Sequence, residues 1–525
     1  MAPAELANAL ALVGVVILIA ALLSGLVERS GVPQVAIFLG LGAALGPAGM
    51  GALDVGLDSP ALHVVATLSL ALILFTDALT LNLREAREHR TLALLALGPG
   101  TLLSAVLFAA AAVWLLDFSV PAAAILGAAL ASTDPVLLKG LLRRPELPAA
   151  ARHALRLESG LNDIVLLPIV LVALVFLEGQ QLLPASWARL GLDLFLLGPG
   201  AGIAVGVFGL ATLDMMRRRF GVRRDYESLY SLGIAFAAFA AAEAVHGSGF
   251  LAAFGAGLTI AFFDVELCDC FREYGETTAE LALLLTFVLL GGSLIWSGLA
   301  LATGPVLAFV ALVLFARPAI YLLAFAPAHI ERPARLLVAW FGPRGLSTLL
   351  LALLPVFAGA HEGAAIFQVA CLVVLVSIVG HGGALMWMGQ RAQRNAAAAP
   401  PAPSPAAVAG TADPELITIA ELRGLLAVGA PIVPVDVRRE EPRTESGLQA
   451  QGSRRLSLEG IPDYGALGAP SDAWQIAYCT CPSEGSSLRA VRELRRRGWP
   501  RARALVGGFD AWRGAGLPVE PNSAP

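Results

Sequence analysis

The sequence predicts a polytopic α-helical membrane protein of about thirteen spans, followed by a small α/β domain with a parallel sheet. The first observation is composition. Of the 525 residues, 57% are hydrophobic and 14% are charged, whereas a soluble protein carries about 25% charged residues. The second is a series of apolar runs along residues 1–390, each about 18–25 residues long and able to cross a bilayer as a helix. The third is a change after residue 414 to short apolar strands that alternate with amphipathic helices.

The apolar runs define the expected spans, which short polar loops separate. No basic segment precedes the first run, and this run is long enough to cross a bilayer, so we expect a retained helix and not a cleaved signal peptide. The second and ninth runs are short and contain glycine. The expected spans cover residues 6–27, 32–48, 62–83, 92–116, 120–142, 153–178, 190–214, 228–247, 249–264, 279–296, 300–325, 334–357 and 364–389.

Charge and cysteine usage exclude several classes of protein. The net charge of −4 is too small to indicate nucleic acid or another highly charged partner. The 5 cysteines are too few and too scattered for a disulfide framework. Nearly all basic residues are arginine, which indicates a GC-rich genome, and we expect the cytoplasmic (inner) membrane of a bacterium. The remaining partners are then the lipid bilayer and small ions.

Basic loop residues predict the orientation. The loops that follow odd-numbered spans are rich in arginine, whereas those that follow even-numbered spans contain almost no Arg or Lys. Because basic loops stay on the cytoplasmic side, the N-terminus is expected outside and the C-terminal domain in the cytosol. The basic residues concerned are Arg84, Arg87, Arg90, Lys139, Arg143, Arg144, Arg152, Arg217, Arg218, Arg219, Arg223, Arg224, Arg332, Arg335, Arg391 and Arg394.

A polar sequence at the sixth span, Glu158-Ser159-Gly160-Leu161-Asn162-Asp163, precedes the apolar run 164–177. Because a helix advances about 3.6 residues per turn, Ser159 and Asp163 share one face, and Glu158 and Asn162 share the adjoining face. A carboxylate within the membrane costs about 2.5–3.5 kcal/mol on insertion scales, and such residues mark ion or proton pathways. We therefore expect the transport chemistry at this helix.

Two other spans carry residues that interrupt a helix. The fifth contains Thr133-Asp134-Pro135, and the twelfth contains Gly342-Pro343-Arg344-Gly345. Proline removes a backbone donor and clashes with the preceding turn, and a broken backbone is tolerated at bilayer depth only where it faces protein or water. One interruption lies in each half of the chain, as an inverted repeat requires, and such pairs indicate the site of a transporter.

These motifs resemble those of the NhaP/NHE-type sodium/proton antiporters. The similar stretches are ASTDPV, ESGLNDIVLLP, SGFLAAFGAGL and FGPRGLSTLLLALL, in order along residues 5–390. The resemblance implies that Thr133, Asp134, Glu158, Ser159 and Asp163 surround the transported cation, and that Arg344 pairs with Glu158. The Asn-Asp order is similar to that of electroneutral members, which exchange one cation for one proton. The resemblance also implies a homodimer formed through the early spans.

The residue chemistry leads to the same expectation. A hard cation such as Na+ prefers oxygen ligands, which Asp134, Ser159, Asp163 and the carbonyl of Thr133 supply. Burial favours a protonated carboxyl and a bound cation favours an ionised one, so Asp163 holds a proton or a metal ion and not both. We expect Asn162 to organise the site by a hydrogen bond to Glu158 or Arg344. No cofactor is expected, and Li+ or K+ could bind the same oxygens.

Other polar residues in the spans are weaker indications. Asp77, in the middle of the third span, is a secondary candidate. His381 lies in a glycine-rich stretch and is expected to pack between helices. Arg317 is expected to form a structural ion pair, because an unpaired arginine in a span is unfavourable.

The C-terminal part is predicted to be a separate domain. Residues 1–390 form the transmembrane domain, 391–413 an Ala/Pro-rich linker of partly extended character, and 414–525 the α/β domain. Strands are expected at 432–437, 475–478 and 502–506, and a helix at 486–497. Cys479 follows a strand and precedes a helix, where converging amides and the helix dipole favour a thiolate.

This domain resembles the rhodanese-like family over residues 414–521, notably in its closing run VGGFDAWRGAGLPVEP. The resemblance implies that Cys479 carries a persulfide. The loop after Cys479 departs from the common pattern because it contains Cys481, Pro482 and Glu484. Cys481 could resolve Cys479 in a sulfide or redox sensor, and a non-catalytic docking module is a further alternative.

Two functional classes follow. The first is electroneutral exchange of Na+, or of Li+ or K+, for H+, with the cytosolic domain as a sulfur or redox regulator. The second is a membrane-tethered sulfurtransferase centred on Cys479. A persulfide-responsive K+/H+ antiporter combines the two.

Overall fold

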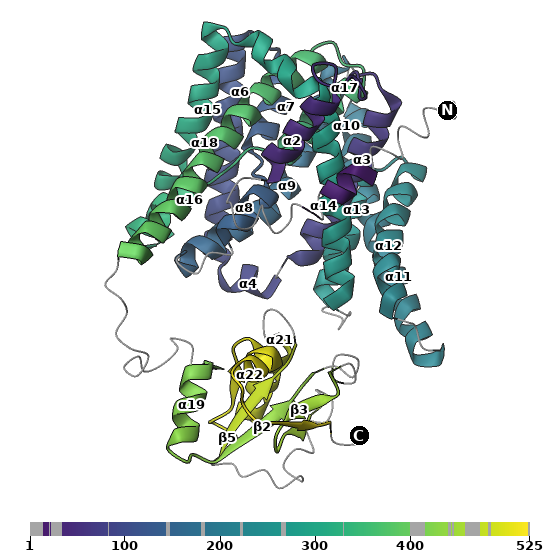
Figure 1. The fold of residues 1–525 in the computed structure, drawn as a ribbon. Helices are drawn as coiled ribbons and strands as arrows, with labels where there is room; N and C mark the ends of the chain where they lie inside the picture. The colour runs from purple at the N-terminus through teal and green to yellow at the C-terminus, as the bar shows by residue number, and fades with distance from the viewer. Residues whose placement is uncertain are drawn as a thin grey trace. The chain divides into compact units, whose positions relative to one another are not determined.

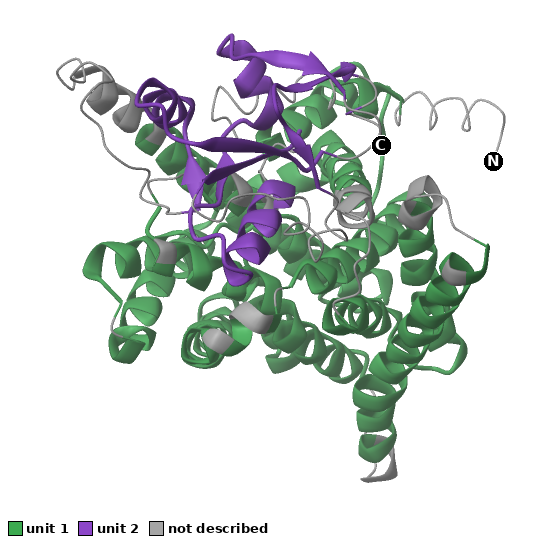
Figure 2. Cartoon of the chain, turned by 90° about the horizontal axis from the view of Figure 1, so that it is seen from below, with its two compact units in different colours: residues 1–394 green, residues 395–525 purple. Residues whose placement is uncertain are grey.

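The computed structural model divides into two compact units, residues 1–394 and residues 395–525 (Figure 2). Each unit is described by itself. The structure describes residues 14–19, 22, 34–81, 83–142, 147–179, 184–220, 224–263, 269–328, 330–398, 415–438, 443, 446–456, 473–480 and 485–522.

The first unit is a bundle of helices (Figure 1). Its elements are α2 (Gln34–Leu45), α3 (Pro60–Thr80), α4 (Leu83–Glu88), α5 (Arg90–Leu95), η1 (Ala96–Leu102), α6 (Leu103–Leu116), α7 (Val120–Ala131), α8 (Pro135–Leu142), α9 (Ala149–Leu177), α10 (Pro184–Leu192), η2 (Asp193–Leu197), α11 (Gly198–Phe220), α12 (Arg224–Ala244), α13 (Gly249–Phe263), α14 (Asp269–Gly292), η3 (Leu294–Leu301), α15 (Gly304–Ala324), η4 (Ala326–Ala328), α16 (Arg332–Trp340), α17 (Leu346–Phe357) and α18 (Gly363–Ala398).

Every expected span from the second onward overlaps helix in the structure, whereas most of the first expected span lies outside the described residues. By length and composition, 6 described helices can cross a membrane, or 7 if the bent pair Thr277–Gly292 and Leu294–Leu301 is one span. Other apolar helices are shorter, such as Gln34–Leu45 and Leu346–Phe357. Uninterrupted spanning helices are therefore fewer than the apolar runs, because short and broken segments account for the others.

Both predicted interruptions are confirmed. Helix α7 ends at Ala131 and α8 begins at Pro135, while α16 ends at Trp340 and α17 begins at Leu346. A proline early in the helix lacks only an N–H that would be unpaired there in any case, so Pro135 is suited to begin α8. The residues between the paired half-helices have no regular secondary structure.

The interrupted segments lie inside the unit. Helix α7 consists largely of alanine, and its residues from Ala122 to Ala131 are mostly buried. A helix that is apolar all round is surrounded by other elements, and α7 packs against α6, α9 and α17. The small side chains let backbones approach closely. The interruption at residues 132–134 is thereby held in the protein interior.

Helix α18 differs from the expectation for the linker. It continues to Ala398, into the region predicted as a partly extended linker from residue 391. The alanines near its end have the highest helix propensity of all residues, which favours continuation of the helix. The rest of the predicted linker lies outside the described residues.

The second unit contains a parallel sheet of order β1-β6-β5-β2-β4 and an antiparallel pair, β3 with β7. The strands are β1 (Leu416–Ile417), β2 (Ile432–Asp436), β3 (Leu448–Ala450), β4 (Arg454–Arg455), β5 (Trp474–Tyr478), β6 (Arg503–Leu505) and β7 (Val519–Pro521), and the helices are α19 (Ile419–Ala427), α21 (Gly485–Arg496) and α22 (Gly508–Gly514). The predicted strands and the predicted helix 486–497 are confirmed to within one residue at each end.

Alternating side chains of this sheet supply two apolar clusters. On one side, Ala477 of β5 joins Val491 and Leu494 of α21. On the other, Ile476 and Tyr478 join Phe509 and Trp512. Successive strand residues point to opposite faces, so helices cover both faces of the sheet, as parallel sheets require.

Candidate functional site

The two interruptions contact each other directly. The backbone N–H of Asp134 donates to the carbonyl of Pro343 at 3.0 Å. The carboxylate Oδ2 of Asp134 accepts a hydrogen bond of 2.7 Å from the backbone N–H of Leu346. In the other direction, Nη1 of Arg344 donates to the carbonyls of Ala131 at 3.2 Å and Ser132 at 3.0 Å.

Each interruption thus supplies the charge that the opposite helix end requires. A helix N-terminus has unpaired N–H groups and a partial positive charge, and a C-terminus has unpaired carbonyls and a partial negative charge. Asp134 caps the beginning of α17, and Arg344 caps the end of α7. Both side chains are buried, with 1% and 2% of their surface exposed. The two ionisable residues that marked the interruptions in the sequence therefore stabilise the crossing.

Two glycines of the second interruption permit these contacts. A Cβ atom on Gly345 would lie 1.9 Å from Oδ2 of Asp134, and a Cβ atom on Gly342 would lie 2.0 Å from Cζ of Arg317. Real Cβ contacts are never so short, so any larger residue displaces a charged group. The Gly-Pro-Arg-Gly sequence is required here for close approach.

Asp163 of α9 reaches the first interruption. Its Oδ1 accepts a hydrogen bond of 3.0 Å from the hydroxyl of Ser132, and the carboxyl is close enough to Asp134 to interact electrostatically. The two carboxyls predicted to share the site are therefore brought together. Ser132 was missed in the sequence, although it directly precedes Thr133 and Asp134.

Asn162 contacts the interruption and not the residues expected. Its amide nitrogen donates to the Thr133 hydroxyl at 3.0 Å and is 3.5 Å from the Thr133 carbonyl. The expected hydrogen bond to Glu158 or Arg344 is wrong, because Asn162 faces α7 from the neighbouring turn of α9. Its Oδ1 is buried and has no hydrogen-bond partner among the described residues. Ser159, on the face of Asp163, is 5% exposed and its hydroxyl lies 3.4 Å from the carbonyl of Arg156.

The expected pairing of Glu158 with Arg344 is also wrong. Nη2 of Arg317, on α15, donates to both carboxylate oxygens of Glu158, at 2.7 Å and 2.9 Å. The hydroxyl of Tyr321 donates to Oε1 of Glu158 at 2.8 Å. The expectation that Arg317 forms an ion pair is confirmed, and the partner is the carboxylate that had been assigned to Arg344.

Arg317 contacts the end of α16 in the same way as Arg344 contacts the end of α7. Its Nη1 donates to the carbonyls of Val338 at 3.1 Å and Ala339 at 2.7 Å, near the end of α16. The guanidinium carbon also lies 4.1 Å from the centroid of the Tyr321 ring. Both half-helix C-termini therefore end against a guanidinium.

The remaining membrane candidate, Asp77, lies in α3 and is half-buried. Helix α3 contacts α9, but the role of Asp77 stays a prediction. In the part of the chain that the structure describes, no three His, Cys, Asp or Glu side chains gather as a resident metal centre would require. The oxygens near Asp134 and Asp163 are of the kind that a hard cation prefers.

In the second unit, Cys479 directly follows β5, the central strand of the sheet. Its side chain is 1% exposed and belongs to the apolar cluster of α21, and its carbonyl accepts a hydrogen bond of 2.9 Å from the N–H of Phe509. Cys481, like Pro482 and Glu484, lies outside the described residues.

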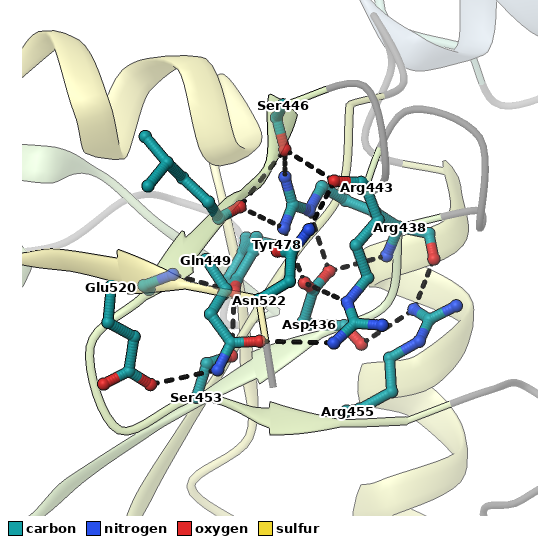
Figure 3. A network of polar contacts seen from close by, with 12 residues as sticks. Asp436, Arg438, Arg443, Ser446, Gln449, Ser453, Arg455, Tyr478, Glu520 and Asn522 are labelled. Carbon is teal, nitrogen blue, oxygen red and sulfur yellow. Dashed lines mark hydrogen bonds and ion pairs between the residues drawn. The ribbon is translucent and has the colours of Figure 1, made fainter. Parts of the chain in front are cut away.

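A buried polar network lies at the same edge of the sheet (Figure 3). Asp436, at the end of β2, accepts hydrogen bonds from Nε of Arg438 at 3.0 Å and from Nη2 at 2.7 Å. The hydroxyl of Tyr478 lies 2.7 Å from that of Ser453. Burial, together with the charge of Asp436, raises the pKa of Tyr478 to about 12. This network fixes the ends of β2 and β5.

Comparison with known proteins places the first unit in a family. Residues 15–391 match the family model described as sodium/hydrogen exchanger, transmembrane. This match ends before the second unit, for which no rhodanese family match was found.

Relatives of known name are similar over most of the chain. The K(+)/H(+) antiporter NhaP of Alkalimonas amylolytica is 27% identical over 375 residues, which cover 70% of this chain and 64% of that protein. The Na(+)/H(+) antiporter NhaG of Bacillus atrophaeus is 26% identical over 331 residues, 61% of this chain and 62% of that protein. The chain thus spans less than two thirds of the length of these two relatives.

The solved structure of the sodium proton antiporter MjNhaP1 from Methanocaldococcus jannaschii at pH 8 has a similar fold, with a TM-score of 0.60 and 20% sequence identity. The similarity covers 72% of this chain and 100% of that chain. With broken helices that cross beside buried carboxyls, and with a family match over most of its length, the chain is an integral multi-pass membrane protein that belongs to the sodium/hydrogen exchanger family.

Proposed function

We propose that the protein exchanges one monovalent cation for one proton across the cytoplasmic membrane, with Na+ as the cation. The single observation that carries the proposal is the buried carboxyl of Asp163, which accepts a hydrogen bond from Ser132 inside the α7–α8 interruption and lies beside Asp134. Carboxylates, hydroxyls and backbone carbonyls are the oxygen ligands that a hard cation prefers. We assign Asp134, Ser159, Asp163 and Thr133 to the cation site.

Competition for one carboxyl couples the two ions. A cation at Asp163 requires the ionised carboxylate, and protonation removes the charge that holds the cation. Asp163 therefore carries one or the other, and access alternating between the two sides converts this competition into exchange. No further chemistry is required.

The buried charges support a stoichiometry of one to one. Among the described residues of the first unit, the buried charged side chains are Asp134, Glu158, Asp163, Arg317 and Arg344. Three carboxylates and two guanidiniums leave one negative charge when all are ionised. One Na+ or one proton neutralises it, and an uncompensated buried charge is strongly unfavourable. We therefore infer electroneutral exchange, with the Glu158–Arg317 pair and Arg344 as fixed compensating charges.

The experiment uses proteoliposomes with a preset pH gradient and a fluorescent pH indicator. Adding Na+ is expected to dissipate the gradient without creating a membrane potential, as a potential-sensitive dye would report. A gradient that no cation dissipates would overturn the proposal. A panel of Na+, Li+ and K+ decides the substrate, because relatives of this chain are named both K(+)/H(+) and Na(+)/H(+) antiporters.

We propose further that the N-terminus faces outside, that the second unit is cytosolic, and that the protein is a homodimer. Basic loops after the odd-numbered expected spans support the orientation. Cysteines introduced singly into these loops should react with an impermeant maleimide in everted vesicles and not in intact cells. Light scattering of the purified protein gives the number of subunits.

For the second unit we propose a rhodanese-like regulatory module. The order β1-β6-β5-β2-β4 sends the chain in opposite directions after β2 and β5. In open parallel sheets, ligands bind at the carboxyl ends of strands where the connections diverge in this way. Cys479 and Asp436 lie at this edge, which supports a persulfide at Cys479 as a signal that changes transport.

An autonomous sulfurtransferase is the alternative for this unit. Burial of the Cys479 side chain counts against rapid turnover, because reactive cysteines are partly exposed. Release of thiocyanate from thiosulfate and cyanide by the full chain, abolished by Cys479→Ser, would establish the enzyme. Thiosulfate can transfer its outer sulfur to the Cys479 thiolate, with sulfite as the leaving group. A change of transport by thiosulfate that Cys479→Ser abolishes would establish the regulatory role, and transport indifferent to thiosulfate would contradict it.

A further inference from the structure

Helix α18 carries two polar side chains that join both sides of the second interruption. Nε2 of His381 lies 3.2 Å from the carbonyl of Trp340, the last residue of α16. Its Nδ1 lies 3.0 Å from the hydroxyl oxygen of Ser377. That hydroxyl accepts a hydrogen bond of 2.8 Å from the backbone N–H of Arg344. One helix face therefore holds the backbone on either side of residues 341–343.

Each ring nitrogen of His381 lies near a backbone carbonyl, Nε2 near that of Trp340 at 3.2 Å and Nδ1 near that of Ser377 at 3.1 Å. A carbonyl only accepts, so the tautomer with its hydrogen on Nε2 donates to Trp340, and the tautomer with its hydrogen on Nδ1 donates to Ser377. In the first tautomer Nδ1 accepts from the hydroxyl of Ser377, whose oxygen accepts from Arg344 N–H. The tautomer with its hydrogen on Nε2 satisfies every group in the chain Arg344–Ser377–His381–Trp340.

Burial makes these contacts significant. Ser377 is 0% exposed and His381 is 8% exposed, so water does not replace a lost hydrogen bond, and an unsatisfied buried group is unfavourable by about 1–3 kcal/mol. Phe341 N–H still donates to the carbonyl of Leu337 at 2.9 Å, but residues 341–345 form no regular secondary structure that would define their shape. The position of the interruption is therefore set by side chains from other helices.

The segment that His381 and Ser377 hold is also the one that contacts Asp134. Within this segment, the carbonyl of Pro343 accepts a hydrogen bond from Asp134 N–H. The segment ends at Leu346, whose N–H donates to the Asp134 carboxylate. A shift of this segment would change which oxygens of Asp134 are free to meet a cation. We propose that His381 and Ser377 are positioning residues. They hold the α16–α17 interruption where its contacts leave the Asp134 carboxylate able to bind the transported cation. This inference rests on the proposed function.

The test compares two replacements of His381 in purified full-length protein in proteoliposomes. His381→Gln places an amide N–H near the position of Nε2 and can still donate to the Trp340 carbonyl, whereas His381→Leu fills similar volume without any hydrogen bond. We expect His381→Leu to raise the apparent KM for Na+ by about fivefold or more, with a smaller change in the maximal rate. His381→Gln should stay within about twofold of the unchanged protein.

Ser377→Ala provides a second, independent measurement, because it removes the acceptor for Arg344 N–H in a small side chain. It should raise the KM as His381→Leu does. If His381→Leu reaches the reconstituted state poorly, Ser377→Ala alone decides the question. KM values unchanged in Ser377→Ala, or equal in the Gln and Leu variants, would overturn the positioning role. An unchanged protein that moves no cation would instead overturn the proposed function.

Discussion

The carboxylate of Asp134 and the backbone N–H of Leu346 lie 2.7 Å apart, although 212 positions separate the two residues in the chain. The contact joins the two halves of the membrane unit at their broken helices. Because the same carboxyl lies beside Asp163, the cap of α17 and the proposed cation site share one side chain. Changes at the interruption are therefore expected to change ion binding.

Asp163→Asn should abolish exchange while the protein still folds. Asparagine keeps an oxygen that accepts from Ser132 but carries no charge and takes up no proton, so neither ion can be carried. Asp117→Asn is the matched control, because Asp117 is exposed and has a positive φ of 54° that asparagine tolerates. Dissipation of a pH gradient in proteoliposomes measures both, and exchange by Asp163→Asn at the unchanged rate would refute the site.

A double-mutant cycle should distinguish the Glu158–Arg317 ion pair of the structure from the Glu158–Arg344 pair that the sequence predicted. Glu158→Gln and Arg317→Gln each leave a buried charge uncompensated, which destabilises by about 3–5 kcal/mol. Together they remove both charges, so the double variant should be far more stable than the sum predicts. Thermal unfolding in detergent gives the values. The cycle of Glu158→Gln with Arg344→Gln should show little coupling, and a strong coupling there would contradict the structure.

Gly345→Ala should lose most of the exchange activity. The added methyl would lie 1.9 Å from Oδ2 of Asp134 and must displace the carboxylate from Leu346 N–H. Gly233→Ala, in α12, meets no atom within 4 Å and serves as the control. Initial rates at several Na+ concentrations would check the prediction, which fails if both alanine variants behave alike.

The second unit should lose stability above pH 10 because Tyr478 ionises. The pKa of Tyr478 is raised to about 12 in the folded unit, above the value of about 10 for an unfolded chain. The contribution is therefore complete below pH 10 and is lost as the pH rises through 12, by about 2–3 kcal/mol. Urea unfolding of residues 414–525 at pH 9–12 measures it.

Tyr478→Phe is the control for this titration, because phenylalanine does not ionise. The unit contains no lysine, so no ammonium group titrates in the same range. The same loss of stability in Tyr478→Phe would show that another group is responsible.

The interruptions could be predicted from the sequence, but their partners could not. Pro135 and the Gly342-Pro343 pair are incompatible with a continuous helix, and this local chemistry located both breaks. Arg317 and Arg344 carry the same guanidinium in neighbouring spans, and only the path of the chain decides which one reaches Glu158. Resemblance to a family assigned the wrong arginine for that reason.

Ser132, His381 and Ser377 illustrate a different limit. Serine and histidine are common in helix interfaces, so their presence in an apolar span carries little information. Their importance comes from the backbone groups that they contact, which residues far away in sequence supply. The adjacency of Ser132 to Thr133 and Asp134 was the one local signal available. In the second unit, by contrast, alternation of apolar residues located the strands well.

The reciprocal capping of the broken helices also limits how the molecule can move. Asp134 and Arg344 each neutralise an end of the other broken helix, so separating the two broken helices at this junction would leave two helix ends and two buried charges uncompensated. We therefore expect the two broken helices to move together as one body.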